Sequence, residues 1–378
     1  MSYNYRSVIP ENIKDTYEQY DQVDFVCTFE GQAINLNSVR LEGKVNVTQD
    51  GAELNTVTNN IKDIKLDRFV GAHSFIESVQ TQINGGNLIE NITNYGRYVK
   101  MTTSATHGQG DMCNASAVCE LKAPTERMSN MVLKGVVPET APPSLGVNAL
   151  RVDPDFSFKP LIALNSGVGS ALPYSKSGVI RLSFNLARVG AALYGVDVNA
   201  NTLYTLSDLK LSYSTIPETP EMKDQKIVMN TKLCISQSVQ TQLANIAVKV
   251  PSVVNAVSCS FLAQGSENSL KDNTLGLEKV PNVNQLQFMF NDSTNSYISF
   301  LLRDNVEIVG RYLDSFYDSP RNAMTINNLA NNDGYGVGLD FDDFVDLRNQ
   351  KFNLQIDSAI SNLNPMIVYM YFHSIVSI

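Results

Sequence analysis

The feature that most constrains this chain is a succession of short runs rich in β-branched and aromatic residues, separated by turn-forming residues. Such runs occupy 23–29 and 34–41, and Asp50-Gly51, a dipeptide typical of tight hairpin turns, follows the next one. The runs continue as far as 366–372, whereas helical patterns are few and short, at 89–102, 187–193 and 305–316. Many short strands with few helices predict an all-β sandwich or barrel architecture.

The length of the chain predicts two such units. Its 378 residues, 43% hydrophobic and 18% charged, have a globular composition and are enough for two domains of ordinary size. Residues 217–225 contain two prolines among mixed charges, which is typical of a linker. Residues 1–20 precede the first clear strand and are polar, so they are predicted to form an arm, with a short helix at 11–18.

A weak internal repeat supports the division into two halves. Three short segments recur in the same order, and each half then ends in one further strand-like run. This shared order favours a tandem duplication, with an extra proline-rich loop at 105–150 in the first half. The paired segments are Gln80-Thr81-Gln82-Ile83-Asn84 with Gln287-Phe288-Met289-Phe290-Asn291, Gly96-Arg97-Tyr98 with Gly310-Arg311-Tyr312, and 182–186 with 351–355.

These strand and turn patterns resemble those of the double jelly-roll major capsid proteins of the tectivirus–adenovirus lineage. The resemblance covers most of residues 22–378, and it is a pattern of strands and turns rather than a diagnostic motif. The segments that carry it are 158–164, 178–188, 206–214, 335–341 and 352–356.

The resemblance implies an all-β fold of two tandem eight-stranded jelly-roll β-sandwiches, with a few short helices in loops. It further implies a trimer whose six rolls form a pseudo-hexagonal block, and such blocks tile an icosahedral shell. The expected regions are an N-terminal arm (1–20), a first jelly roll (21–216) with the proline-rich loop (105–150), a linker (217–225) and a second jelly roll (226–378).

The same resemblance implies the partners and the location of the protein. The partners would be two further copies of the chain, neighbouring capsomers, penton and minor capsid proteins, and an internal membrane reached through the arm 1–20. The protein would be made in the host cytoplasm and would end in the virion. The N-terminus lacks the apolar segment of a secretory signal, and no apolar run approaches the length of a membrane helix.

The charge of the chain argues against direct binding of nucleic acid. The formal net charge is −9, and lysines and arginines do not cluster anywhere along the sequence. A protein that binds nucleic acid through phosphates needs a basic surface to neutralise them. We therefore expect any contact with a genome to be indirect.

The sequence offers no recognisable catalytic, cofactor or metal site. His73, His107 and His373 lack partners at metal-ligand spacing. The acidic group Asp340, Asp342, Asp343 and Asp346 could suggest a cation site, but the upstream loop has Leu329 where a calcium loop needs an acidic residue, which favours a solvated turn. Gly167-Val168-Gly169 and Gly336-Val337-Gly338 are too short to cradle a phosphate and are interpreted as turn glycines. The prediction is a protein that is not an enzyme and has no cofactor.

The five cysteines fit neither a zinc site nor a disulfide framework. They are Cys27, Cys113, Cys119, Cys234 and Cys259, an odd number without a Cys-x-x-Cys pair. Free thiols are the simpler interpretation, although Cys113 and Cys119 could pair across a loop.

Two functions from different classes remain open at this point. One is the capsid building block, and the other is a β-sandwich spike, fibre or lectin-like protein that binds a glycan. Sandwich folds serve many functions, so the fold does not decide between them. The internal repeat favours the capsid protein, and the absence of tryptophan removes the commonest aromatic platform for a sugar.

Overall fold

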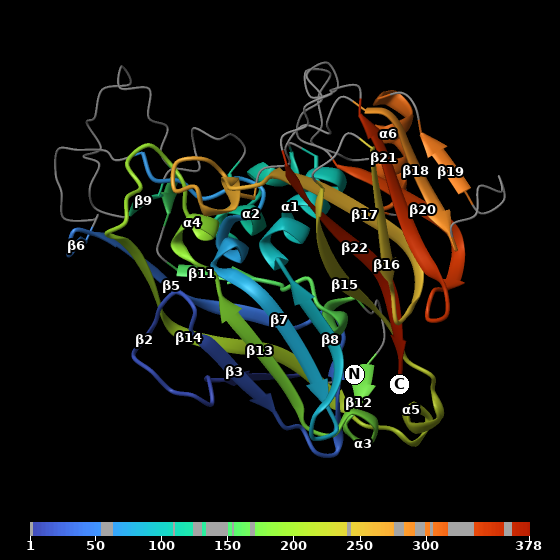
Figure 1. Cartoon of the computed structure of the whole chain (residues 1–378). Coiled ribbons are helices and arrows are strands. Elements are labelled where there is room, and N and C mark those ends of the chain that lie inside the picture. The colour runs from blue at the N-terminus through green and yellow to red at the C-terminus, as the bar shows by residue number, and fades with distance from the viewer. Residues whose placement is uncertain are drawn as a thin grey trace.

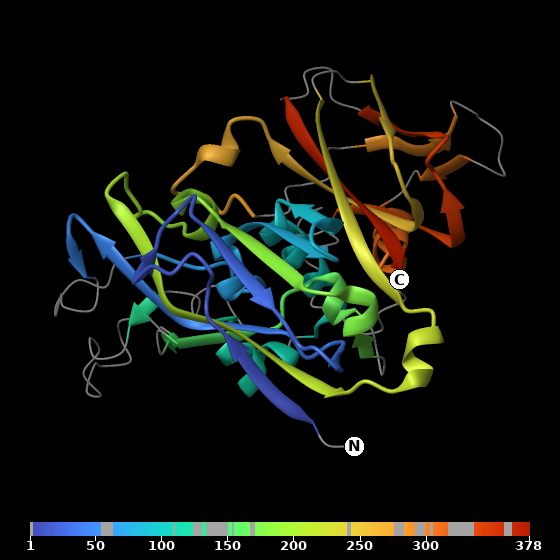
Figure 2. The same ribbon diagram turned by 90° about the horizontal axis from the view of Figure 1, so that it is seen from below.

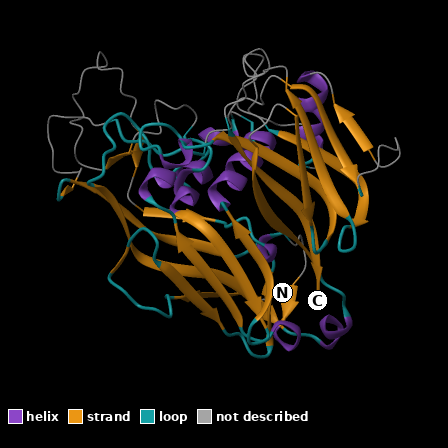
Figure 3. Cartoon of the chain, viewed as in Figure 1, coloured by secondary structure: helices purple, strands orange, loops and turns teal. Residues whose placement is uncertain are grey.

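The protein folds as two β-sandwiches that lie side by side, the first built from the N-terminal half and the second from the C-terminal half (Figure 1). Several helices lie at the end of the molecule away from the two termini (Figure 3). The computed structural model describes residues 3–53, 63–108, 110–123, 131–133, 150–152, 155–166, 171–239, 243–275, 283–291, 299–302, 305–316, 336–358 and 365–378.

The first sandwich has one sheet organised around the long strand β14 (Thr202–Pro217). Leu211 of β14 pairs with Val8 on one side and with Leu41 on the other, so β14 separates two sets of strands. On the first side lie β1 (Asn4–Val8) and β2 (Thr16–Tyr17). On the other side lie β4 (Gln32–Asn35) and β5 (Arg40–Gln49), followed by β11 (Asp155–Phe158), β12 (Ala171–Pro173) and β6 (Ala52–Glu53).

The second sheet of this sandwich contains four strands, in the order β3, β13, β7 and β8. The alternation of exposed and buried residues in β3 directs Val23, Phe25 and Cys27 toward the core, as the period of two along a strand requires. The four strands are β3 (Gln22–Cys27), β13 (Ile180–Leu186), β7 (Ile76–Ile83) and β8 (Asn87–Thr93).

In the described part of the chain, the second sandwich has eight strands, four in each sheet. One sheet has the order β15, β22, β17, β20, and the other has the order β16, β21, β18, β19. The strands are β15 (Val228–Val239), β16 (Leu243–Lys249), β17 (Val253–Ala263), β18 (Val283–Phe290), β19 (Ser299–Leu302), β20 (Val337–Asp346), β21 (Lys351–Ser358) and β22 (Met366–Ser377).

Both sandwiches have the same strand order, which is that of a jelly roll. The strands of each half can be numbered 1 to 8 along the chain, with β1 and β2 together as strand 1 of the N-terminal half and β4 and β5 together as its strand 3. In both halves, one sheet then has the strand order 1-8-3-6 and the other has the order 2-7-4-5. This confirms the predicted all-β fold with two tandem jelly rolls. The small strands β6, β9, β10 and β12 are additions to the first roll.

The segments of the internal repeat occupy equivalent positions in the two rolls. Residues 80–83 lie in the fourth strand, β7, and 287–290 lie in its counterpart β18. The two Gly-Arg-Tyr triplets lie in α1 (Tyr95–Thr106) and α6 (Asn305–Asp314), each of which follows the fifth strand of its roll. The third pair falls in the seventh strands, β13 and β21, so the predicted repeat is confirmed by position.

The predicted N-terminal arm needs correction, because residues 1–20 contribute the first strand of the first roll. β1 and β2 pair with β14 along the outer edge of the sheet, which Figure 2 shows in dark blue. Tyr17 is buried in the first core, where its hydroxyl donates to the Asn12 carbonyl at 2.9 Å. No helix forms at 11–18. The polar sequence concealed this strand because an edge strand needs few apolar side chains once its backbone is paired.

The expected proline-rich loop at 105–150 also needs correction. Its first part forms the end of α1, a 3-10 turn at Asp111–Cys113 and the helix α2 (Ala115–Cys119). Farther along, β9 (Met131–Leu133) pairs in parallel with β10 (Leu150–Val152). Residues 124–130 and 134–149 lie outside the described part of the chain.

The remaining described helices are short and lie in connections between strands. The predicted linker at 217–225 contains one of them, α5, between the last strand of the first roll and β15. They are the 3-10 turns η2 (Gly71–Phe75), η6 (Ala163–Asn165) and η7 (Ser266–Asn268) and the helices α3 (Tyr174–Ser177), α4 (Val189–Ala192) and α5 (Pro220–Asp224).

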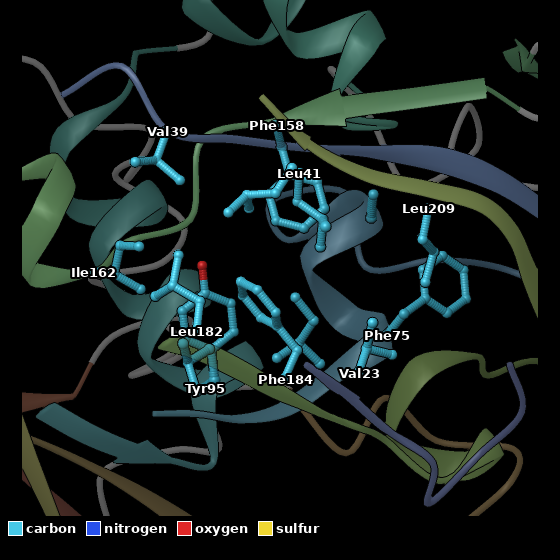
Figure 4. Close-up of a cluster of buried hydrophobic side chains, with 14 of the residues drawn as sticks. Val23, Val39, Leu41, Phe75, Tyr95, Phe158, Ile162, Leu182, Phe184 and Leu209 are labelled. Atoms are coloured by element: carbon cyan, nitrogen blue, oxygen red, sulfur yellow. The ribbon is translucent and has the colours of Figure 1, made fainter. Parts of the chain in front are cut away.

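Each roll has its own hydrophobic core between its two sheets. In the first core, Phe184 of β13 faces Leu41 and Phe158 from the opposite sheet (Figure 4). In the second, Phe352 of β21 meets Phe372 of β22 with ring centroids 5.1 Å apart. The separate cores support two folding units, and burial of these large side chains is the main stabilising contribution in each.

Helix α1 of the first half covers the outer face of the second roll. Tyr371 and Phe372 are neighbours in β22 and point to opposite faces of the sheet. Phe372 points into the second core, whereas Tyr371 contacts Tyr98 of α1, with ring centroids 5.4 Å apart. Both faces of β22 are covered, and the side chains along this strand are accordingly apolar almost throughout. The contact of α1 with β22 makes a tightly packed junction between the two rolls.

Candidate functional site

The junction between the two rolls holds a buried carboxylate. Glu90 of β8 accepts hydrogen bonds from the Ala163 amide at 2.9 Å and from the Thr81 hydroxyl at 3.0 Å. A third donor, the Thr231 hydroxyl at 3.3 Å, comes from β15 of the second roll. Burial raises the pKa of Glu90 to about 7, although these hydrogen bonds and the charge of Lys232 lower it in part.

A buried lysine lies in the same junction. Lys232 of β15 is 9% exposed and lies opposite His373 of β22 in the pairing of the two strands. Its ammonium group lies 6.0 Å from the centre of the Tyr98 ring. Burial lowers the pKa of Lys232 to about 8, and the nearby Glu90 opposes this shift. The junction therefore combines two ionisable groups that both favour their neutral forms more than they would in water.

A cavity of about 350 Å³ lies between the rolls. Its walls carry Glu77, Arg97 and Arg188 from the first roll and Glu267 and Tyr369 from the second. Desolvation raises the pKa of the Glu77 carboxyl, and the two arginines oppose this effect. The cavity thus carries balanced charge and is part of the inter-roll junction.

The three histidines have separate surroundings. The buried His73 lies 2.9 Å from the Tyr95 hydroxyl, and burial lowers its pKa to about 4. His107 follows α1 and contacts its neighbour Thr106. His373 contacts the Ser258 hydroxyl at 3.0 Å, and burial lowers its pKa far below the usual range. Each histidine therefore has a packing or hydrogen-bonding role, and the described residues contain no group of three or more potential metal ligands.

The acidic residues singled out from the sequence lie on β20, and the structure does not gather them around a common point. Asp342, Asp343 and Asp346 are exposed, while Asp340 is half-buried. Asp346 pairs with Arg348 at 2.6 Å, which holds the pKa of this carboxyl at about 2. Strand geometry spreads successive side chains over two faces, so this group is a solvated strand end rather than a set of ligands.

The glycines near this strand serve packing rather than turns. A Cβ atom on Gly336 would lie 2.0 Å from the Cys259 carbonyl oxygen, and one on Gly338 would lie 2.5 Å from the Ser315 hydroxyl. Only glycine allows such close approach of neighbouring segments. The other candidate, Gly167-Val168-Gly169, lies outside the described residues.

All five cysteines are unpaired, and they differ in exposure. Cys27 and Cys259 are buried, whereas Cys113 and Cys119 are exposed on the segment around α2. Burial raises the pKa of the Cys27 thiol to about 12, which disfavours the reactive thiolate form.

Exposed apolar side chains concentrate on the N-terminal edge of the first roll. Tyr5 is 87% exposed on β1, and the connection from β1 to β3 adds several more. An exposed sheet edge with apolar side chains is a surface that proteins usually cover. The exposed apolar residues of this edge are Tyr3, Tyr5, Ile9, Ile13 and Tyr20. Among the described helices, none is both long and apolar enough to cross a membrane.

Sequence reasoning missed the charged residues of the inter-roll junction. Glu90 and Lys232 lie in strand-like runs, and such a charge inside an apolar run is the signal that could have identified them. Their partners come from distant parts of the chain, so the runs alone do not show what they contact.

Comparison with known proteins finds similarity only at the level of structure. No protein-family model matches the chain, and no curated protein sequence matches it. The Faustovirus major capsid protein superimposes with a TM-score of 0.66 at 8% identity, over 100% of this chain and 90% of that one.

Two further solved structures give the same result. A quasi-atomic model of the PBCV-1 virus capsid has a TM-score of 0.61 at 12% identity and covers 100% of this chain and 94% of that one. The mavirus major capsid protein has a TM-score of 0.52 at 9% identity, with 98% and 86% covered. These are double jelly-roll proteins, and the likeness shows that this chain has the same fold.

Proposed function

We propose that this chain is a viral major capsid protein that forms the shell of a virion. The observation that carries the proposal is the presence of two complete jelly rolls with one strand order, side by side in one chain. Viral capsid proteins match this arrangement over nearly their whole length. A protein of this kind acts through its shape and its edges, and its function requires no catalytic group.

The proposed assembly is a homotrimer. Three chains with two rolls each place six similar sandwiches around one axis, and this block fills a six-fold position with three-fold symmetry. A dimer would provide four rolls and no hexagonal tile. The exposed apolar side chains of the N-terminal edge supply area that a neighbouring copy would cover.

The wider partners follow from the same proposal. Blocks of this kind meet neighbouring capsomers, penton proteins and minor capsid proteins, and an internal membrane is a further candidate. The net charge of −9 supports a shell that does not contact the genome directly. The N-terminal segment is a less suitable membrane anchor than the sequence suggested, since β1 and β2 are paired with β14.

Light scattering combined with negative-stain microscopy of the purified protein tests this proposal. We expect a species of about 125 kDa, three times the 41.7 kDa of one chain, that resists dilution and appears as hexagonal blocks of one size. A dimer would contradict the tiling arrangement. A monomer at all concentrations would instead favour a spike, fibre or lectin-like protein that binds a glycan. Binding of the protein to a glycan array would then test that alternative.

A further inference from the structure

We propose that residues 264–275, here called the strap, lock the two rolls in one relative orientation, with Arg97 and Arg188 as the positioning residues. The strap leaves the second roll at the end of β17 and runs across the first roll. Its first residue remains tied to its own roll, because the Gln264 amide donates to the Pro365 carbonyl at 2.8 Å. All the contacts of the strap lie within one chain, so its role in holding the rolls does not depend on how copies of the chain assemble. Only the consequence for a capsid rests on the proposed function.

Arg188 holds the first turn of the strap. Its guanidinium group donates through Nη1 to the Asn268 side-chain oxygen and through Nη2 to the Glu267 carbonyl. Because the two N–H donors lie in one rigid plane, they fix the orientation of the strap relative to Arg188 as well as its distance. A lysine ammonium group, which acts as a point charge, would not fix the orientation. This contact fixes the position of η7 against the first roll.

Arg97 holds the other end of the strap. Its Nη2 donates to the Thr274 carbonyl, and its guanidinium carbon lies 4.4 Å from the centre of the Tyr369 ring in β22. Arg97 is 4% exposed, so its charge has little access to water. If the strap moved away, Arg97 would lose a partner inside a buried site, which is costly.

Between these two arginines the backbones of the strap and the first roll come into close contact. A Cβ atom on Gly190 would lie 2.9 Å from the Ser269 carbonyl oxygen, so glycine is needed for this approach. The Gly190 carbonyl accepts from the Thr274 hydroxyl at 3.0 Å, and the Gly195 amide donates to the Leu270 carbonyl at 3.3 Å. The strap therefore follows the surface of the first roll along its length.

Side chains of the strap also enter the first roll. Leu275 is buried in the first core, and Leu270 packs against it. Asn273 donates to the buried Asp67 carboxylate at 2.6 Å, and the same carboxylate pairs with Lys100 of α1. These contacts combine apolar burial with hydrogen bonds to charged groups, so sliding or rotation of one roll would break several of them together.

The consequence is that the angle between the rolls is set within one chain before any assembly. A hexagonal tile needs a defined angle between its sandwiches, and an interface held by one sheet pairing alone would allow rotation. The strap, the pairing of β8 with β15, and α1 together remove this freedom. Residues that hold the strap thus position the rolls without contacting another subunit.

Distance measurement between spin labels tests this inference on the full chain. One label is attached to the exposed Cys113 of the first roll, and the other to Asn245→Cys on an exposed position of β16, in a background with Cys119→Ser. A chain that lacks Cys113, Cys119 and the introduced cysteine checks that the other cysteines stay unlabelled. Magnetic dilution with unlabelled protein removes distances between chains, so the result does not depend on trimer formation.

The variant to compare is Arg97→Met with Arg188→Met. We expect the distance distribution to widen at least about twofold while far-UV circular dichroism stays unchanged, because each roll keeps its own core. Arg181→Met is the matched control, since this half-buried arginine pairs with Glu11 inside the first roll at 2.9 Å. A distribution as narrow as that of the wild type in the folded double variant would overturn the inference.

A second measurement covers the case in which the double variant does not fold. Lys271 is an exposed residue of the strap, but its neighbours Leu270 and Leu275 are packed against the first roll. A protease needs several residues in extended form around the cleaved bond, so we expect trypsin to cleave after Lys271 when the strap leaves the first roll. Gly190→Ala alone should increase the rate of this cleavage by roughly tenfold, because the added methyl group displaces the Ser269 carbonyl. An unchanged rate in Gly190→Ala would contradict the strap, whereas failure of the wild type to form trimers would contradict only the proposed function.

Discussion

Asn91 of β8 and Leu233 of β15 are partners in a parallel pairing that joins strands of the two rolls into one eight-stranded sheet. Glu90 and Lys232, the residues that precede this pair in each strand, are buried charged groups. The two rolls keep separate cores, yet the joint between them contains ionisable side chains with shifted pKa values. The stability of the joint should therefore depend on pH.

Replacing Glu90 with glutamine should remove part of this pH dependence. The pKa of Glu90 is raised from 4.5 to about 7 by burial, so the folded protein retains a proton that the unfolded chain releases between these values. The free energy of unfolding of the wild type should fall as pH rises across this window, by about 3 kcal/mol. Urea unfolding at several pH values checks this, with the exposed Glu30→Gln as control. Equal pH slopes for wild type and Glu90→Gln would count against it.

Replacing Lys232 with methionine should stabilise the protein at neutral pH by about 1–3 kcal/mol, because it removes an ammonium group that folding takes out of water. Burial lowers the pKa of Lys232 from 10.5 to about 8, so below pH 8 the folded state holds a buried charge at a cost. As pH rises from 8 to 10.5, the wild type should gain stability and the advantage of methionine should shrink. Chemical denaturation measures both effects. The exposed Lys249→Met is the control, and destabilisation by Lys232→Met alone would refute the argument.

Replacing Tyr17 with alanine should destabilise the first roll by about 3–5 kcal/mol, because it removes a buried aromatic ring. Tyr17 is 2% exposed, and its hydroxyl bonds the Asn12 carbonyl. Tyr5→Ala is the control, since Tyr5 on the neighbouring β1 is 87% exposed and should change stability by less than about 0.5 kcal/mol. Urea unfolding of both variants provides the comparison. If the two substitutions had equal effects, the N-terminal segment would behave as an arm after all.

Deletion of residues 1–20 should impair folding rather than assembly alone. It removes β1, β2 and Tyr17, and it exposes the edge of β14. An exposed long strand pairs readily with other chains, so the truncated protein should aggregate. Solubility and circular dichroism of the truncated chain check this. A soluble, fully folded product would restore the original expectation of an arm.

The protein should show negligible affinity for nucleic acid at physiological salt. Its net charge is −9, and no stretch of the sequence concentrates lysine or arginine. Affinity for duplex DNA depends on neutralising phosphates and falls steeply with salt. A gel-shift titration into the micromolar range measures it, with a basic DNA-binding domain as positive control. A shifted band at physiological salt would contradict the prediction.

The sequence by itself determined the class of fold and the division into two similar units. Alternation along runs such as 23–29, turn residues such as Asp50-Gly51 and the order of the repeated segments are local signals, and local backbone preference decides whether a run forms a strand. The two Gly-Arg-Tyr triplets could be assigned to equivalent places because their neighbours in the chain also match.

Only the tertiary structure decided which strands pair and where the charged residues lie. The polar segment 1–20 becomes a strand because β14 offers it an unpaired edge, which nothing within those residues indicates. Arg97 and Arg188 meet the strap across separations of about eighty residues or more, and Glu90 meets Thr231 across a comparable gap. Such contacts form when the cores bring distant strands together. Their energy depends on burial and on partners that no local pattern specifies.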